Sequence, residues 1–332
     1  MVQTWIILAP LALHIPPAAV RASSIPPIAL SIPVDCKIGG QCLVQKLFDH
    51  DPSAERRDYH CGVLTTDGHD GVDFRLRTMA DMRAGVAVIA AADGMVVRVR
   101  DAEPDISVKV RKELNGRDAG NGVVIDHGNG WVTQYSHLRL GSVSVRPGQR
   151  VRVGEKLGLI GMSGNAEFPH LHFALRFQER SIDPFTGPTA PQDCKPGQAG
   201  ATYVWNSRAR QALQYRPTAL IAIGISPVAP PASVGERGDP ARSSAPTDPI
   251  IAWVDIFGSM SGDIQRFSIT GPDQTSILDQ SKTLDQGHLS WFSYAGRRAP
   301  AGGWKPGRYI ATYELLRDGA IVATGRSEAV IR

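Results

Sequence analysis

Short apolar runs separated by glycine-containing turns are the feature that most constrains the fold of this chain. The runs 121–126 and 131–135 flank His127-Gly128-Asn129-Gly130, which predicts a β-hairpin. The runs 86–92 and 95–99 flank Asp93-Gly94 and predict another hairpin in the same way. With 34 Gly and 24 Pro in 332 residues, turns are frequent along the chain. We therefore expect a mainly β protein built from antiparallel strands.

Composition divides the chain into five segments. The stretch 226–249 is rich in Pro, Ala, Ser and Gly, which is typical of a linker. Beyond it, alternating strands and a turn at Arg317-Asp318-Gly319 predict a small antiparallel β-sandwich. The predicted segments are a leader at 1–22, an irregular arm at 23–60, a compact strand-rich domain at 61–195, a linker or irregular segment at 196–249 and a β-sandwich-like domain at 250–332.

The first residues resemble a secretory signal peptide. The apolar run Trp5–Leu13 is too short to span a bilayer as a helix, and small residues follow it up to Ala22. No other stretch is long enough for a transmembrane helix, so we expect no stable membrane insertion once the signal is removed. The predicted location is the periplasm or the extracellular space.

Four cysteines in an exported chain suggest disulfide bonds, and four can pair in three ways. The glycines between Cys36 and Cys42 would let a small loop close between them. The remaining pair, Cys61 and Cys194, would then join the two ends of the strand-rich domain.

The net charge of +4 comes from scattered Lys and Arg residues. No dense basic block or basic stripe interleaved with aromatic residues is present, which argues against a nucleic-acid partner. A mild positive charge is compatible with anionic surfaces such as cell-wall polymers.

Two pairs of residues have spacings that suit a metal site. His170 and His172 are separated by one residue, so in a strand they point to one face while Leu171 and Phe173 point to the core. His69 and Asp73 are also an even number of residues apart, and Gly71 between them permits close approach. Imidazole and carboxylate groups suit zinc, and catalytic zinc sites use three protein ligands and leave one position open.

Each of these patterns has a simpler interpretation when taken alone. A His-x-His occurs by chance in many chains, His137 could be a structural residue at a strand end, and His127 would cap a hairpin. Asp70 reads as a solvated neighbour of the site. The functional interpretation rests on the occurrence of the histidines and Asp73, in order, within one glycine-rich β region.

Three segments in that region resemble the motifs of the lysostaphin/LytM-type zinc metallopeptidases. They are His69-Asp70-Gly71-Val72-Asp73, Tyr135-Ser136-His137-Leu138, and Ser163-Gly164-Asn165 followed by Pro169-His170-Leu171-His172-Phe173. The resemblance covers roughly residues 61–186. It implies a compact antiparallel β-sheet domain of the duplicated hybrid motif type, with a groove over the metal.

The resemblance also implies the roles of individual residues. His69, Asp73 and His172 correspond to the Zn²⁺ ligands, and His137 and His170 correspond to the catalytic histidines. The implied activity is endopeptidase cleavage of peptide cross-links in bacterial peptidoglycan. The chain has no His-Glu-x-x-His motif, so a histidine rather than a glutamate would act as the base.

Two features depart from the family pattern. Glu167-Phe168 stands where the family often has small residues, and the charged segment 101–118 is long enough to form a groove wall. Both features affect which substrate fits the groove more than they affect the hydrolytic reaction.

Two other functions are compatible with parts of the sequence. A non-catalytic cell-wall-binding or hydrolase-activating protein could keep the same fold, but it would be expected to lack one or more of the five residues. A lipoyl-like carrier would explain the turn-rich run 151–158 but not the histidines.

Overall fold

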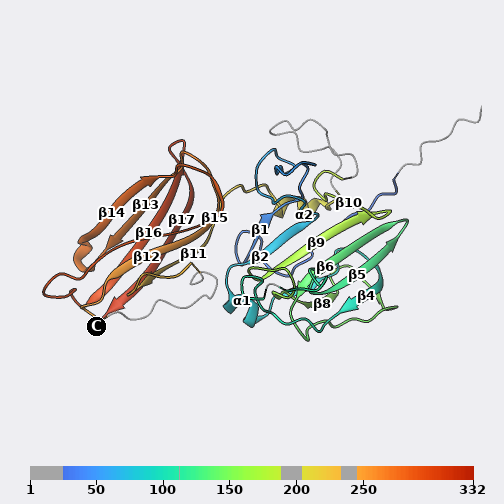
Figure 1. The fold of residues 1–332 in the computed structure, drawn as a ribbon, viewed down its shortest axis with the longest axis horizontal. Coiled ribbons are helices and arrows are strands. Elements are labelled where there is room, and N and C mark those ends of the chain that lie inside the picture. Colours follow the sequence, from blue (N-terminus) through green and yellow to red (C-terminus); the bar gives the residue numbers. More distant parts are fainter. Residues whose placement is uncertain (1–24, 112, 188–203, 233–244) are drawn as a thin grey trace, which may run out of the picture.

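The computed structural model describes residues 25–111, 113–187, 204–232 and 245–332, so the predicted leader at 1–22 lies outside the described residues. Figure 1 shows two lobes rich in β-strands, the first coloured blue to yellow and the second orange to red. Every pairing between the named strands is antiparallel, which confirms the mainly β prediction. Among the described residues, no helix has the length and hydropathy needed to cross a membrane.

The first lobe is built on one large sheet with the strand order β1-β2-β9-β6-β5-β4-β7, and β10 pairs with β9. Its strands are β1 (Cys42–Lys46), β2 (Val72–Leu76), β4 (Gly94–Arg100), β5 (Asn121–Gly128), β6 (Trp131–Leu138), β7 (Arg150–Val151), β9 (His170–Phe177) and β10 (Arg180–Ile182). A second, two-stranded sheet consists of β3 (Ala87–Ile89) and β8 (Lys156–Leu159).

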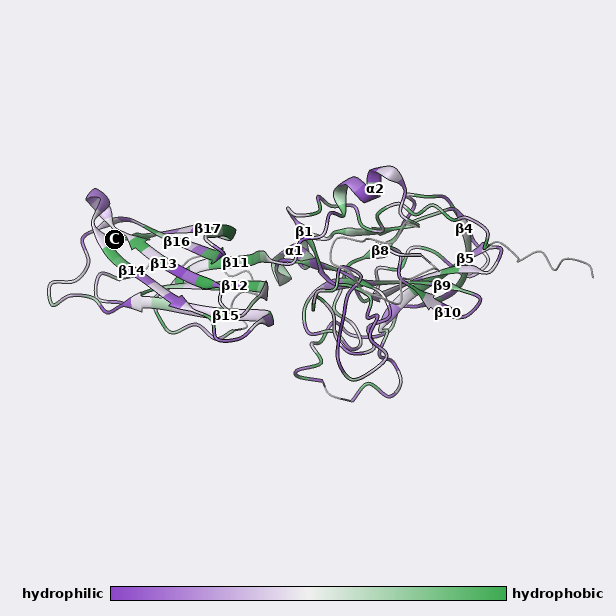
Figure 2. Ribbon diagram, turned by 90° about the horizontal axis from the view of Figure 1, so that it is seen from above, coloured by the Kyte–Doolittle hydropathy of each residue, from purple (hydrophilic) through white to green (hydrophobic). Residues whose placement is uncertain are grey.

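Two short helices accompany the first lobe, α1 (Met79–Ala84) and α2 (Ser207–Ala212). Helix α1 begins at a capping box, in which Thr78 Oγ1 accepts from the Asp81 amide and the Asp81 carboxylate accepts from the Thr78 amide. Helix α2, mostly hydrophilic in Figure 2, lies on the outside of the lobe, with Ala209 as its buried residue.

Alternation along β2 and β9 separates the core from the functional face of the sheet. Val72 and Phe74 on β2, and Leu171 and Phe173 on β9, are all 0% exposed and belong to one hydrophobic cluster. The residues between them point to the opposite face. This face carries the polar residues that form the site.

The second lobe consists of two antiparallel sheets that share one hydrophobic core. One sheet has the order β11-β12-β15 and the other β14-β13-β16-β17. The elements are β11 (Ala219–Ser226), β12 (Ile250–Ser259), β13 (Ile264–Thr270), the 3₁₀ helix η1 (Pro272–Gln274), β14 (Ser276–Thr283), β15 (His288–Arg297), β16 (Gly307–Arg317) and β17 (Ala320–Ile331). We call this lobe the C-terminal sandwich.

The predicted hairpin at His127–Gly130 and the predicted turn at Arg317–Gly319 both form. Strands β5 and β6 pair around His127–Gly130, and β16 and β17 pair around Arg317–Gly319. The hairpin predicted at Asp93-Gly94 is wrong, because β3 pairs with β8 and β4 pairs with β5 and β7.

Two segments expected to be irregular contain strands. Residues 42–46 of the predicted arm form β1 at the edge of the large sheet. Residues 219–226 of the predicted linker form β11 of the C-terminal sandwich. The predicted Cys36–Cys42 disulfide is present, while the predicted Cys61–Cys194 bridge involves Cys194, which lies outside the described residues.

Candidate functional site

Antiparallel pairing of β2 with β9 brings the two halves of the site together. Asp73 lies directly opposite His172, and Arg75 lies directly opposite His170. Their side chains share the polar face of the sheet, since directly opposed residues in a sheet point the same way. His69 precedes β2 in a turn closed by a hydrogen bond from its amide to Thr66 O.

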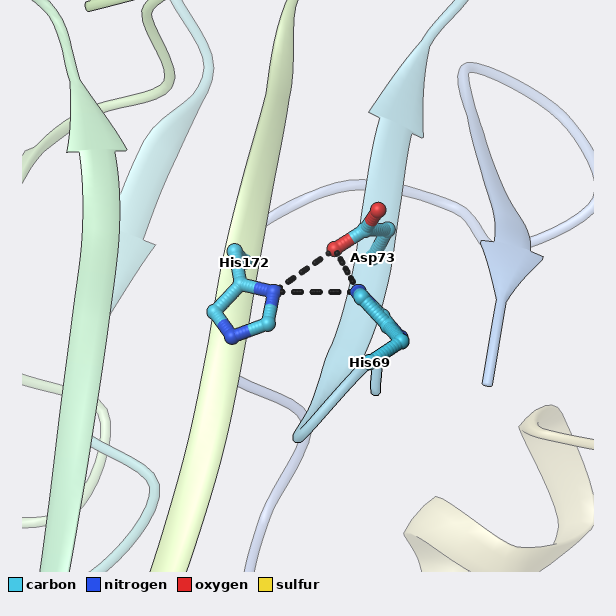
Figure 3. Close-up of side chains that lie close together, drawn as sticks. All are labelled: His69, Asp73 and His172. Carbon is cyan, nitrogen blue, oxygen red and sulfur yellow. Dashed lines mark hydrogen bonds and ion pairs between the residues drawn. The ribbon is translucent and has the colours of Figure 1, made fainter. Parts of the chain in front are cut away.

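Three potential ligand atoms from these segments face one another, as Figure 3 shows. Asp73 Oδ1 lies 3.1 Å from His69 Nε2 and 3.0 Å from His172 Nδ1, and the two nitrogens are 3.2 Å apart. Two Zn–N or Zn–O bonds of ordinary length at a tetrahedral angle separate their ligand atoms by about 3.3 Å. The triangle of His69, Asp73 and His172 therefore has the donor types and nearly the dimensions of three zinc ligands.

The outward nitrogen of each of these histidines is fixed by a hydrogen bond. His69 Nδ1 donates to Leu47 O at 2.7 Å, since a carbonyl can only accept. His172 Nε2 donates to Asp70 Oδ1 at 3.1 Å. The lone pairs of His69 Nε2 and His172 Nδ1 are thereby directed to the centre of the triangle, the usual arrangement at protein metal sites.

Gly71 is needed for the approach of His172. A Cβ atom at this position would lie 2.8 Å from His172 Nε2 and 2.6 Å from Phe173 O. Any larger residue would push β9 away from the turn that carries His69. The prediction that Gly71 permits close approach is confirmed.

Asp70 is more than the solvated neighbour that the sequence suggested. Its carboxylate accepts from His172 on one side and from Arg176 Nη2, at 3.2 Å, on the other. The hydrogen bond from His172 lowers the pKa of Asp70 to about 2. Asp70 is thus an ionised group that orients His172.

Two further histidines lie beside the triangle. The ring centroids of His137 and His170 are 4.6 Å apart, and His137 is 6.0 Å from His172. His137 Nδ1 donates to Ser163 O at 2.7 Å, and His170 Nδ1 donates to Phe168 O at 2.8 Å. In the neutral rings, both Nε2 atoms therefore carry a free lone pair that can accept a proton.

Burial keeps these two histidines in their neutral form. It lowers the pKa of His137 well below its ordinary value, and the proximity of His170 adds to the effect. Burial also lowers the pKa of His170, against the opposing charge of Asp73. Both rings are consequently unprotonated at neutral pH, as a general base must be.

A groove runs over these residues, and the segments that depart from the family motifs border it. Its lining includes Asp118, at the end of the charged 101–118 segment, and Glu167 and Phe168. Val108 N donates to Ala166 O at 3.0 Å, which joins the charged segment to the stretch before Phe168. The expectation that 101–118 contributes to a groove wall is met at its C-terminal end.

All five site residues predicted from the sequence lie on this groove, while His127 does not line it. His127 bonds to Asp93 O and Thr133 Oγ1, a structural position in its hairpin. Asp70 was present in the first motif but gave no sequence signal of its own. Its role follows from contacts with residues about 100 positions away.

Residues 67–184 match the sequence model of Peptidase family M23. The peptidoglycan DD-endopeptidase ShyA of Vibrio cholerae is 36% identical over 115 residues, which are 35% of this chain and 22% of that protein. The DD-carboxypeptidase/endopeptidase Mpg of Neisseria meningitidis is 35% identical over 113 residues, 33% of this chain and 22% of that protein. The chain thus spans about a fifth of the length of these relatives.

The solved structures similar to this chain include a zinc-containing peptidase from Vibrio cholerae. It is 27% identical, with a TM-score of 0.28, and the match covers 42% of this chain and 39% of that one. The catalytic domain of lysostaphin from Staphylococcus simulans is 24% identical, with a TM-score of 0.27, covering 35% of this chain and 76% of that one.

Proposed function

We propose that this chain, whose residues 67–184 match the model of Peptidase family M23, is an exported, zinc-dependent endopeptidase that hydrolyses peptide cross-links of bacterial peptidoglycan. The observation that carries this proposal is the placement of a neutral histidine pair beside a three-ligand triangle in one groove. The relatives named as peptidoglycan endopeptidases support the substrate class.

In this proposal His69, Asp73 and His172 hold the zinc ion. The ion, when bound, supplies Lewis-acid chemistry, which lowers the pKa of water and polarises a peptide carbonyl. Asp73 is suited to this role because its carboxylate is ionised. Burial would raise its pKa, but His69, whose Nε2 lies 3.1 Å from the carboxylate, holds the pKa well below its ordinary value.

His137 and His170 perform the proton transfers. The Nε2 lone pair of one ring takes the proton of the attacking water. The other ring, once it carries a proton on Nε2, stabilises the oxyanion or protonates the leaving amine. Their Nδ1 protons are held by Ser163 O and Phe168 O, so both rings keep the tautomer and the orientation that this work requires.

The presence of all five residues argues against the alternative, a wall-binding or activating protein without catalysis. Such a protein has no need of two buried histidines that remain neutral beside a ligand triangle. All five residues also line one groove.

Removal of zinc is expected to abolish the activity reversibly. Purified peptidoglycan incubated with the full chain should lose cross-links, and a chelator should stop this loss because the triangle alone does not activate water. Added zinc should restore it. Cross-link loss that continues after the chelator has reduced the zinc content to zero would refute the proposal.

Asp70→Asn is expected to weaken zinc binding by roughly tenfold, because a neutral amide no longer holds the His172 ring as a carboxylate does. The affinity is measured by competition with a chromophoric chelator. Asp67→Asn removes the same charge three positions earlier, at an exposed residue, and should leave the affinity unchanged. An equal loss of zinc affinity in both variants would mean that the net charge, and not the contact with His172, determines the affinity.

A further inference from the structure

The C-terminal sandwich packs against the edge of the peptidase sheet that carries the site. Figures 1 and 2 both show β1 and α1 on the side of the first lobe nearest the sandwich. Phe257 on β12 and Ile221 on β11 are each 1% exposed and belong to the hydrophobic cluster of the first lobe. The two lobes therefore share buried surface.

Arg75 on β2 and Arg77, which follows the end of β2, reach into this contact. Arg77 Nη1 donates to Leu220 O at 2.6 Å and to Ile221 O at 2.9 Å. The β11–β12 pairing shifts its register at this point, between Leu220 and Ala222. A bulge leaves backbone groups outside the ladder, and Arg77 satisfies the carbonyls there.

Arg75 is buried more deeply than Arg77, with 1% of its surface exposed. Its Nη1 donates to Gln45 Oε1 at 2.8 Å, and its Nη2 lies 3.6 Å from Asp255 Oδ2 on β12 of the sandwich. Asp255 is itself only 5% exposed. A buried guanidinium needs a counter-ion, and the sandwich supplies one in Asp255.

The same arginine packs against a residue that lines the groove. Its guanidinium carbon lies 4.1 Å from the centre of the Phe168 ring, and Arg75 is the cross-strand neighbour of His170. Phe168 lines the groove, its ring lies 5.0 Å from that of His170, and its carbonyl accepts the His170 Nδ1 proton. A shift of the guanidinium would thus be transmitted to both Phe168 and His170.

We infer that Asp255 is a positioning residue of the peptidase site, acting through Arg75 on Phe168 and His170. The C-terminal sandwich then helps to position residues of the peptidase site, in addition to any binding role. This inference rests on the proposed function for its kinetic consequence, but the coupling itself concerns the structure alone.

The test compares Asp255→Asn with Asp279→Asn in the zinc-loaded full chain. Asp279 is the matched control, because it also pairs with an arginine of the sandwich, Arg266 at 2.8 Å, but on an exposed surface. Asp255→Asn should lower kcat roughly tenfold or more, since small displacements of catalytic groups have effects of this size. Zinc content should stay at one per chain, and Asp255→Glu should recover part of the rate.

Hydrogen exchange provides a reading that does not depend on activity. In Asp255→Asn the amides of 165–173 should exchange faster, while those of β13 and β16 should be unchanged. The double variant Arg75→Met/Asp255→Leu separates positioning from stability, because apolar residues often replace a buried ion pair without loss of stability. It should melt like the native chain and still turn over roughly tenfold more slowly.

The outcomes distinguish this inference from the proposed function. A native chain without hydrolytic activity would overturn the proposed function, and the exchange of 165–173 would still decide the coupling. Native kcat and native exchange in Asp255→Asn would overturn the inference while leaving the peptidase proposal intact. Native turnover in the double variant would also overturn it.

Discussion

Replacement of either His137 or His170 by alanine should lower kcat by roughly 100- to 10,000-fold, the usual contribution of general acid–base catalysis. Zinc content should remain near one per chain, because neither ring belongs to the ligand triangle. Both quantities are measured on the same preparation, by cross-link hydrolysis and by elemental analysis.

His127→Ala is the matched control for these variants. His127 also lies in the large sheet and also makes two hydrogen bonds, but it does not line the groove. It should keep native turnover. Loss of zinc in His137→Ala would contradict its assignment as a residue that does not bind the metal. Full activity in both His137→Ala and His170→Ala would show that these histidines do not carry out the proton transfers.

Replacement of His69, Asp73 or His172 by alanine should have a different result, with zinc and activity lost together. Three protein ligands are the number that catalytic zinc sites use, so two do not retain the ion at low concentration. Asp73→Ala should cause the largest loss of zinc, because Asp73 Oδ1 lies 3.1 Å from His69 Nε2 and 3.0 Å from His172 Nδ1 and completes the triangle between them. Dialysis against metal-free buffer followed by zinc analysis checks this.

The ligand assignment would be contradicted by a variant that keeps one zinc per chain after dialysis. Retention in His172→Ala alone would point to Asp70 as a replacement ligand, since its carboxylate lies beside the His172 ring. The variant His172→Ala/Asp70→Asn decides between these cases.

Local rules predicted part of the geometry of the candidate site, while the roles of its residues were implied by the family resemblance. Alternation in a strand placed His170 and His172 on one face and Leu171 and Phe173 in the core, and the structure agrees. The spacing around Gly71 likewise indicated the close approach that His172 makes.

Strand partners were less predictable than strands. The chain bends at residues 91–93, just before Gly94 begins β4, but β3 and β4 pair with different strands. A turn signal describes only the residues next to it, whereas Val88 and Val96 are both fully buried by packing against distant segments. Burial of this kind decides which strands pair.

The contacts that the sequence did not reveal join residues far apart in the chain. The Asp70–His172 hydrogen bond and the Arg75–Asp255 ion pair are of this type. A single carboxylate or guanidinium has no periodic pattern and occurs on any polar surface. Its role becomes visible only when the fold has placed its partner.

The measurement that tests the central claim most directly is an analysis of chain ends in purified peptidoglycan treated with the zinc-loaded full chain. The account predicts that cross-linked muropeptide dimers become monomers, with new amino groups appearing at the cross-links and no increase in reducing sugar ends. Dimers that persist while the chain carries one zinc ion, or an increase in reducing ends alone, would contradict it.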